Sequence, residues 1–228
     1  VGVVRGESLG SCWEVSRVGA AITDTFSWEA ALNEAGLVVA SGRTVTALEL
    51  SSGSILWEAD VSEAGGAQSI RWAPLISGDT LIFTTQVPST MALDLKTGRQ
   101  LWQKEPFGAR VLFEDVVFVL WYETLVAYEQ RTGTELWRRD LRGDIGKHIR
   151  GRFAGFSTFL AASRSHIFVG DMRGRLWVLD VSTGEPVWSH LPPGATGYSG
   201  AQPLVAEGRL YMSGFTMSLE APPSLYCY

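Results

Sequence analysis

Residues 91–102 read MALDLKTGRQLW, and nearly the same phrase returns three more times along the chain. The other copies read ALELSSGSILW (47–57), AYEQRTGTELW (127–137) and VLDVSTGEPVW (178–188). Their common skeleton is a small residue, an acid two positions later, a turn containing glycine, and a closing tryptophan. One recurring phrase indicates one recurring structural unit.

The spacing of the phrase limits the architecture to two classes. The closing residues are Trp57, Trp102, Trp137 and Trp188, at intervals of 45, 35 and 51, and Trp13 precedes the first by 44. Repeats of this length are typical of β-propellers and of helical solenoids. Short β-branched and aromatic runs flanked by Gly, Asp or Ser favour strands. They lie at 72–76, 80–85, 116–120, 166–170 and 209–213.

Each phrase is predicted to be a β-hairpin. Asp94, like Asp180 in the last copy, can accept backbone N–H bonds across the turn, and a glycine supplies the positive φ that a four-residue connection with a bulge requires. The turn glycines are Gly53, Gly98, Gly133 and Gly184. A four-residue connection is expected to place Leu93 opposite Gln100 and Ala92 opposite Leu101.

Two further strands precede each phrase, so the unit is predicted to be a four-stranded antiparallel blade in an all-β propeller. The segment SWEAALNEAG (27–36) has helical propensity. We nevertheless predict a strand at 28–32, because Trp28 stands nine residues before Leu37, just as Trp72 stands nine before Leu81.

The four phrases resemble the tryptophan-docking motif of the PQQ-like (quinoprotein) β-propeller repeat family over essentially the whole chain. The character of the chain is nearest to the non-enzymatic, BamB-like scaffold branch of that family. The resemblance implies that the motif tryptophan packs between neighbouring blades and over the turn glycine of an adjacent one. That role would fall here to Trp57, Trp102, Trp137 and Trp188.

Four complete phrases are fewer than the seven or eight blades of most members of the family, so the ring has five blades or is part of a larger one. The ends favour closure. SLYCY (224–228) is the first half of a phrase, and SCWEV (11–15), with Trp13, is the complementary half. We expect one propeller domain over 1–228, with a composite closing blade from 1–16 and 200–228 that leaves no exposed sheet edge.

Closure would bring two distant cysteines together. Cys227 takes the place of Ala92 and Cys12 that of Leu101, so the two are expected to be cross-strand neighbours about 4.5 to 5.5 Å apart. They form a disulfide in an oxidising compartment, or remain two small buried thiols in a reducing one.

Composition excludes several partners. The net charge of -5 argues against generic binding to nucleic acid or to anionic membranes. No run of 18 apolar residues is present, so no transmembrane segment is expected. The opening lacks the apolar core of a signal peptide, which predicts a cytoplasmic protein if Val1 is the true start. The family resemblance instead implies an extracytoplasmic, periplasmic location. A monomer is expected.

The dehydrogenase branch of the family, by resemblance, needs a bound quinone, an adjacent Cys-Cys disulfide, a metal held by acid and amide ligands, and a catalytic Asp. The chain has no Cys-Cys pair, and Asn33 is its only asparagine. His148, His166 and His190 lack the spacing of metal ligands. We therefore assign no catalytic residue, metal or cofactor.

Two groups of residues are candidates for binding. The connection RRDLRGDIGKHIRGR (138–152) after Trp137 is the longest between blades and strongly basic. It is either a solvated charged loop or a docking site for an acidic protein segment or phosphate. Its residues are Arg138, Arg139, Arg142, Lys147, His148, Arg150 and Arg152.

The second candidate is the pair Trp28 and Trp72, expected at matching positions on the innermost strands of adjacent blades. They form an aromatic wall at the mouth of the central channel, or they pack in the propeller interior. Gly108, Thr158 and Ala201 hold the matching positions in the other blades.

These observations predict a non-enzymatic β-propeller scaffold that binds a protein partner through loops on one face. The alternative is a quinone-dependent dehydrogenase-like or other small-molecule-binding propeller.

Overall fold

The computed structural model describes a series of small antiparallel sheets. The described residues are 29–33, 36–41, 44–61, 70–85, 89–105, 108–141, 156–171, 175–191, 204–206, 209–214 and 224–227. The first sheet contains β1 (Glu29–Asn33), β2 (Gly36–Ser41), β3 (Thr44–Leu48) and β4 (Ile55–Asp60). The second contains β5 (Ile70–Ser77), β6 (Thr80–Thr85), β7 (Ser89–Asp94) and β8 (Gln100–Lys104).

Three more sheets follow in chain order. The third contains β9 (Ala109–Phe113), β10 (Val116–Trp121), β11 (Thr124–Glu129) and β12 (Glu135–Asp140). The fourth contains β13 (Phe156–Ala162), β14 (His166–Asp171), β15 (Leu176–Asp180) and β16 (Pro186–His190). The last has three strands in the described part of the chain, β17 (Leu204–Ala206), β18 (Arg209–Gly214) and β19 (Ser224–Cys227).

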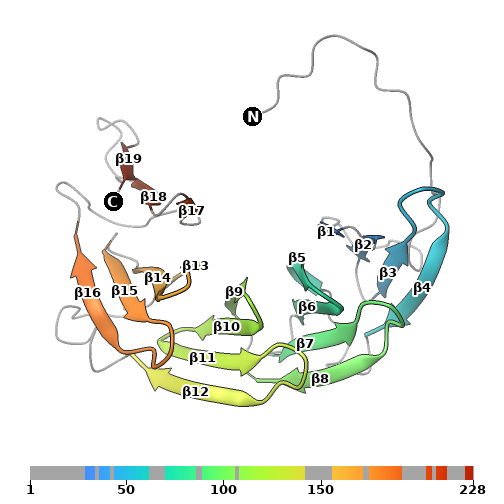
Figure 1. Cartoon of the computed structure of the whole chain (residues 1–228), viewed down its shortest axis with the longest axis horizontal. Helices are drawn as coiled ribbons and strands as arrows, with labels where there is room; N and C mark the ends of the chain where they lie inside the picture. The colour runs from blue at the N-terminus through green and yellow to red at the C-terminus, as the bar shows by residue number, and fades with distance from the viewer. Residues whose placement is uncertain are drawn as a thin grey trace, which may run out of the picture.

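The sheets follow one another around an arc, which confirms the all-β propeller architecture. Figure 1 shows β1, β5, β9, β13 and β17 on the inside of the arc and β4, β8, β12 and β16 on the outside. Every sheet is a meander in which sequential strands pair antiparallel. The composite closing blade remains a prediction, because residues 1–28 lie outside the described residues.

The middle strands are buried on both faces because sheets pack against each other. All residues of β6 and of β3 are buried, whereas the outer strand β4 alternates between exposed and half-buried positions. One hydrophobic cluster joins the first sheet to the second through Val38, Phe83 and Met91. Comparable clusters join the second sheet to the third and the third to the fourth. The core is therefore a row of layers between sheets.

The segment with helical propensity forms a strand, as predicted. β1 covers Glu29–Asn33 and pairs with β2 along its whole length. Pairing with a sheet neighbour overrides the local preference of EAALN, because an inner propeller strand is hydrogen-bonded to its sheet.

The four phrases are the hairpins β3–β4, β7–β8, β11–β12 and β15–β16. Their glycines adopt φ values of +66° to +71°, in the left-handed region that suits glycine. The Asp94 carboxylate accepts the backbone N–H of Lys96 at 3.2 Å and of Thr97 at 3.0 Å. Asp180 accepts the equivalent bonds from Ser182 and Thr183. The acid thus closes the turn at the start of each phrase.

The register predicted for these hairpins was correct at one pair and wrong at the next. Leu93 lies opposite Gln100, but Ala92 lies opposite Trp102, because a β-bulge leaves Leu101 as an extra residue. The same bulge occurs at Leu56, Leu136 and Val187. It places an apolar residue beside each tryptophan, and Leu56, Leu136 and Val187 are more than half exposed.

Three motif tryptophans dock on the turn of the following sheet. A Cβ added to Gly98 would lie 2.5 Å from the indole of Trp57, and Trp102 lies equally close to Gly133. The Trp57 indole N–H donates to the carbonyl of Leu95 at 2.7 Å, and that of Trp102 donates to Gln130 at 2.7 Å.

The third contact repeats this arrangement between the next two sheets. Trp137 lies against Gly184, and its indole N–H donates to the carbonyl of Val181 at 3.2 Å. Each contact combines close approach over a glycine with one hydrogen bond to the backbone.

Candidate functional site

At one end of the strands of the third sheet, Leu141, the last described residue before the rest of the basic connection, lies beside an aromatic turn. In a four-stranded meander the connection to the next sheet and the turn between the second and third strands emerge at the same end. The backbone shows this directly, since Leu141, after β12, donates its N–H to the carbonyl of Glu123 at 2.7 Å. The described chain therefore leaves β12 beside the β10–β11 turn.

The β10–β11 turn presents an aromatic pair that the sequence reasoning missed. Trp121 pairs with Thr124, so Tyr122 and Glu123 form a two-residue turn. Tyr122 has φ +49° and is 63% exposed. Its ring lies edge-on to Trp121, with 4.3 Å between centroids. Two-residue turns usually contain Asn-Gly, Asp-Gly or another glycine, which Tyr122 and Glu123 do not supply, so the sequence carries no signal for this turn.

Two of the predicted basic residues are engaged in ion pairs. Arg138 contacts the carboxylate of Glu135 at 2.7 Å, and this bond lowers the pKa of Glu135. Arg139 contacts Glu185 at 2.6 Å, which links β12 to the hairpin turn of the fourth sheet. Arg138 and Arg139 therefore have local partners, and Arg139 stabilises the contact between sheets.

The other basic candidates, Arg142, Lys147, His148, Arg150 and Arg152, lie outside the described residues, as does Trp28. Trp72 lies on β5, the innermost strand of the second sheet, as expected, although its side chain is not described. Thr158 lies on β13, and Gly108 directly precedes β9. An aromatic wall formed by Trp28 and Trp72 remains a prediction.

The observed register changes the basis of the cysteine prediction. Cys227 ends β19 and pairs with Tyr211 on β18, whereas Trp13 and Cys12 lie outside the described residues. Because the residue at position 92 faces position 102, a strand continuing the phrase would place Trp13, and not Cys12, opposite Cys227. The expected direct cross-strand pairing of the two cysteines was therefore derived from a wrong register.

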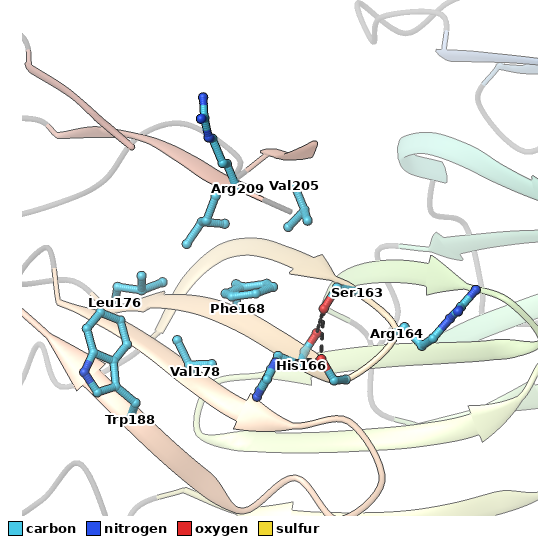
Figure 2. Close-up of a pocket in the computed structure, with 11 residues that line it drawn as sticks. Ser163, Arg164, His166, Phe168, Leu176, Val178, Trp188, Val205 and Arg209 are labelled. Carbon is cyan, nitrogen blue, oxygen red and sulfur yellow. Dashed lines mark hydrogen bonds between the residues drawn. The ribbon is translucent and has the colours of Figure 1, made fainter. Parts of the chain in front are cut away.

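A cavity of about 380 Å³ lies between the fourth and last sheets. Figure 2 shows Phe168, Leu176, Val178 and Trp188 of the fourth sheet on one side of it and Val205 of the last sheet on the other. Trp188 is 47% exposed and stacks parallel to His190, with 5.7 Å between centroids. This motif tryptophan is far more accessible than Trp102, which is 5% exposed.

The two described histidines contact a hydroxyl group and an aromatic ring. His166 shares a 2.8 Å hydrogen bond with the Ser165 hydroxyl, and His190 stacks on Trp188. No cluster of three or more His, Cys, Asp or Glu side chains that could hold a metal ion occurs among the described residues. Within the same residues, no helix is long and apolar enough to cross a membrane.

Comparisons with solved structures show the same fold. BamB from Moraxella catarrhalis is similar over 89% of this chain and 60% of its own, with a TM-score of 0.59 and 17% identity. A europium-containing methanol dehydrogenase is similar over 82% of this chain and 46% of its own, with a TM-score of 0.61 and 15% identity. At these identities the likeness concerns the fold alone.

Sequence comparisons are more specific. Outer membrane protein assembly factor BamB of Kangiella koreensis is 27% identical over 68% of this chain and 40% of its own length. The protein of the same name from Xanthomonas campestris is 30% identical over 56% of this chain and 33% of its own. The chain thus spans about a third to two fifths of the length of these curated relatives.

A family model described as outer membrane protein assembly factor BamB matches residues 10–117 and 122–217. This match covers most of the chain and includes all four tryptophan-closed phrases, which form the four hairpins described above. The chain belongs to the family of outer membrane protein assembly factor BamB.

Proposed function

We propose that this protein is a non-enzymatic scaffold in outer membrane protein assembly, and that it binds a protein partner through the face that carries Tyr122 and the segment 142–155. Membership of the BamB family supports the role, because the curated relatives are named as assembly factors. The name also supports an extracytoplasmic location at the outer membrane.

The observation that carries the choice of face is the exposed Tyr122, whose ring lies edge-on to the half-buried Trp121. Aromatic residues are enriched at the centres of protein interfaces, where they bury a large apolar area and still satisfy a polar tip. Tyr122 is held at positive φ, a conformation that is costly for a residue other than glycine and that concentrates at functional sites. The adjoining basic segment adds long-range attraction for an acidic partner.

The electrostatic part of the proposal is tested by charge reversal. The triple variant Arg142→Glu, Arg150→Glu, Arg152→Glu leaves Arg139 in place, because its ion pair with Glu185 joins two sheets. A photo-crosslinking amino acid that replaces Ile145 is used to capture the partner in outer membrane fractions of the host. We expect one acidic protein of the assembly machinery to be captured, and the triple reversal to abolish its binding.

Arg99→Glu with Arg164→Glu is the matched control, because both arginines are exposed and lie in turns at the opposite end of the strands from Tyr122. These changes leave partner binding and the melting temperature nearly unaffected. Partner binding that is equal in the triple reversal and the wild type, at both low and high salt, would reject the basic segment as the docking site.

The aromatic part is tested separately. Tyr122→Ala should weaken partner binding by more than about tenfold. Tyr122→Gly also removes the ring but suits the positive φ of the backbone, and it should weaken partner binding by the same factor. Recovery of binding in the glycine variant would assign Tyr122 a backbone role and remove the aromatic contact from the proposal.

The non-enzymatic role has its own test. Incubation with PQQ and Ca²⁺, followed by an alcohol-dependent dye-reduction assay, should give no activity above a heat-inactivated sample. Activity above that sample would make the protein a dehydrogenase and would replace the scaffold role.

A further inference from the structure

The β10–β11 turn holds an exposed aromatic ring and an unpaired carboxylate on consecutive residues. Tyr122 is 63% exposed, and its ring contacts Trp121. Glu123 is half-buried, and its backbone carbonyl accepts the N–H of Leu141 at 2.7 Å. Within the residues that the structure describes, neither the Tyr122 hydroxyl nor the Glu123 carboxylate makes a hydrogen bond or an ion pair. Both groups are therefore available to a partner.

The other turn of β10 has the same backbone form but no such vacancy. Glu114 and Asp115 make up this two-residue turn, and Glu114 has φ +52°. The Glu114 carboxylate lies 3.9 Å from the guanidinium of Arg164, and the Asp115 carboxylate accepts the side-chain amide of Gln130 at 3.0 Å. The chain thus supplies contacts to both acids at one end of β10, whereas it supplies none to the Glu123 carboxylate at the other.

The fourth sheet shows which group covers an aromatic ring at the corresponding turn, between β14 and β15. The guanidinium of Arg175 lies 5.9 Å from the centre of the Trp177 ring and donates to the hydroxyl of Ser189 at 3.2 Å. The Trp177 indole N–H donates to the carboxylate of Asp171 at 3.0 Å. An arginine over an aromatic ring, close to a carboxylate, is therefore an arrangement that this molecule already uses.

Ring and carboxylate together favour arginine over other side chains. The negative face of an aromatic ring attracts a cation, and a planar guanidinium can stack on that face while its N–H groups reach a neighbouring carboxylate. Lysine offers a compact, strongly hydrated charge that cannot stack. Because Glu123 is half-buried, its carboxylate has lost part of its hydration, and an ion pair compensates for that loss.

We propose that Tyr122 and Glu123 together form a subsite for one arginine side chain of the protein partner. The guanidinium stacks on the Tyr122 ring and donates to the Glu123 carboxylate. This inference rests on the proposed function, because it names the group that the partner inserts at the face carrying Tyr122. The partner would then present this arginine close to the acidic segment that the basic connection attracts.

A small probe tests the subsite without the partner. N-acetyl-arginine methylamide is titrated into the full chain, whose tyrosine rings carry ¹³C, and the Tyr122 resonances are followed by NMR. Saturable shifts with a dissociation constant on the order of 1 to 10 mM are expected for a single exposed side-chain contact. The citrulline derivative has nearly the same shape without the charge, and it should bind at least about fivefold more weakly.

Three variants separate the ring, the charge and the backbone. Glu123→Gln should weaken binding of the arginine probe about threefold, the size of an exposed ion pair, whereas Glu114→Gln at the opposite turn is the matched control and should change nothing. With the Glu123 backbone amide as reporter, Tyr122→Leu should abolish the response and Tyr122→Phe should retain it within about twofold. Leucine and phenylalanine both lack glycine's tolerance of positive φ, so a purely backbone role would affect both variants equally.

The captured partner provides the second measurement. Tyr122→Leu and Glu123→Gln should each weaken partner binding, and their effects should be non-additive, because both act on one guanidinium. Equal affinity for the arginine and citrulline probes, or full affinity in Glu123→Gln, overturns the subsite even when a partner is captured through position 145, and the proposed function then stands alone. Arginine-selective binding with no captured partner rejects the proposed function instead.

Discussion

The motif tryptophans lie in two kinds of environment in one molecule, and their contributions to the free energy of unfolding differ accordingly. Trp102 is 5% exposed and lies against Tyr128 with 6.0 Å between ring centroids, and its indole N–H is satisfied by a backbone carbonyl. Trp188 is 47% exposed. Removal of the first indole empties a packed site, whereas removal of the second exposes little new apolar surface.

Trp102→Ala should destabilise the protein by about 3 to 5 kcal/mol, the usual cost of emptying a buried aromatic site. Trp188→Ala should cost about 1 kcal/mol or less, because its ring is already half in water. Urea unfolding followed by circular dichroism measures both. Equal unfolding midpoints for the two variants would contradict the difference in packing.

Gly98→Val should lower the melting temperature more than Lys96→Val. Position 98 combines φ +69° with an indole 2.5 Å from the place a Cβ would take, whereas Lys96 is exposed. A β-branched residue resists that φ and would displace Trp57. Thermal unfolding of the two variants side by side is the measurement, and equal shifts would refute the turn geometry.

At the scale of the element, the acid of the hairpin makes turn stability depend on pH. The pKa of Asp94 is lowered, first by the hydrogen bond from the Thr97 hydroxyl and also by the backbone N–H groups of Thr97 and Lys96. The carboxylate is therefore more acidic in the folded state than in the unfolded chain.

This lowered pKa predicts the direction of acid sensitivity. The contribution of Asp94 is fully present above the unfolded-state value of about 3.9 and is lost as pH falls through the lower folded value. Asp94→Asn should therefore lose less stability than the wild type between about pH 4 and pH 2. Urea midpoints across this interval test it; parallel acid losses in both proteins would exclude the linkage.

Much of each element could be predicted from the sequence, because turns and strand periodicity are local. β6 coincides with the apolar run at 80–85, and the four glycines have the positive φ expected of them. A bulge was expected in the connection, but its effect on the register at Ala92 was not, because a one-residue slip leaves the composition of a strand unchanged. Tyr122 was missed because only the backbone reveals its conformation, and the ion pair of Arg139 was not expected because Glu185 is distant in sequence.

At the scale of the whole molecule, stability is expected to be highest in the middle of the arc. The second and third sheets have a hydrophobic cluster on each side, whereas the last sheet, among its residues whose burial the structure describes, contributes Leu210 to the buried part of a small one. In arrays that are stabilised by neighbour contacts, units with two neighbours open less often than units at an end.

Hydrogen exchange followed by mass spectrometry should therefore find the slowest amides in β6, β7, β10 and β11. Amides of β18 should exchange at least about tenfold faster, because local opening there disrupts fewer packed layers. Uniform protection across all sheets would mean that the chain unfolds as one unit and would contradict layered stability.

The docked tryptophans also give the array a direction. In the described residues the first three sheets each extend an indole onto a turn of the following sheet, so the contact is head-to-tail, like that between subunits of a polar filament. A tandem duplication of one unit in the gene would supply both halves of the added contact at once. Lineages could thus lengthen or shorten the array by unequal recombination without evolving a new interface.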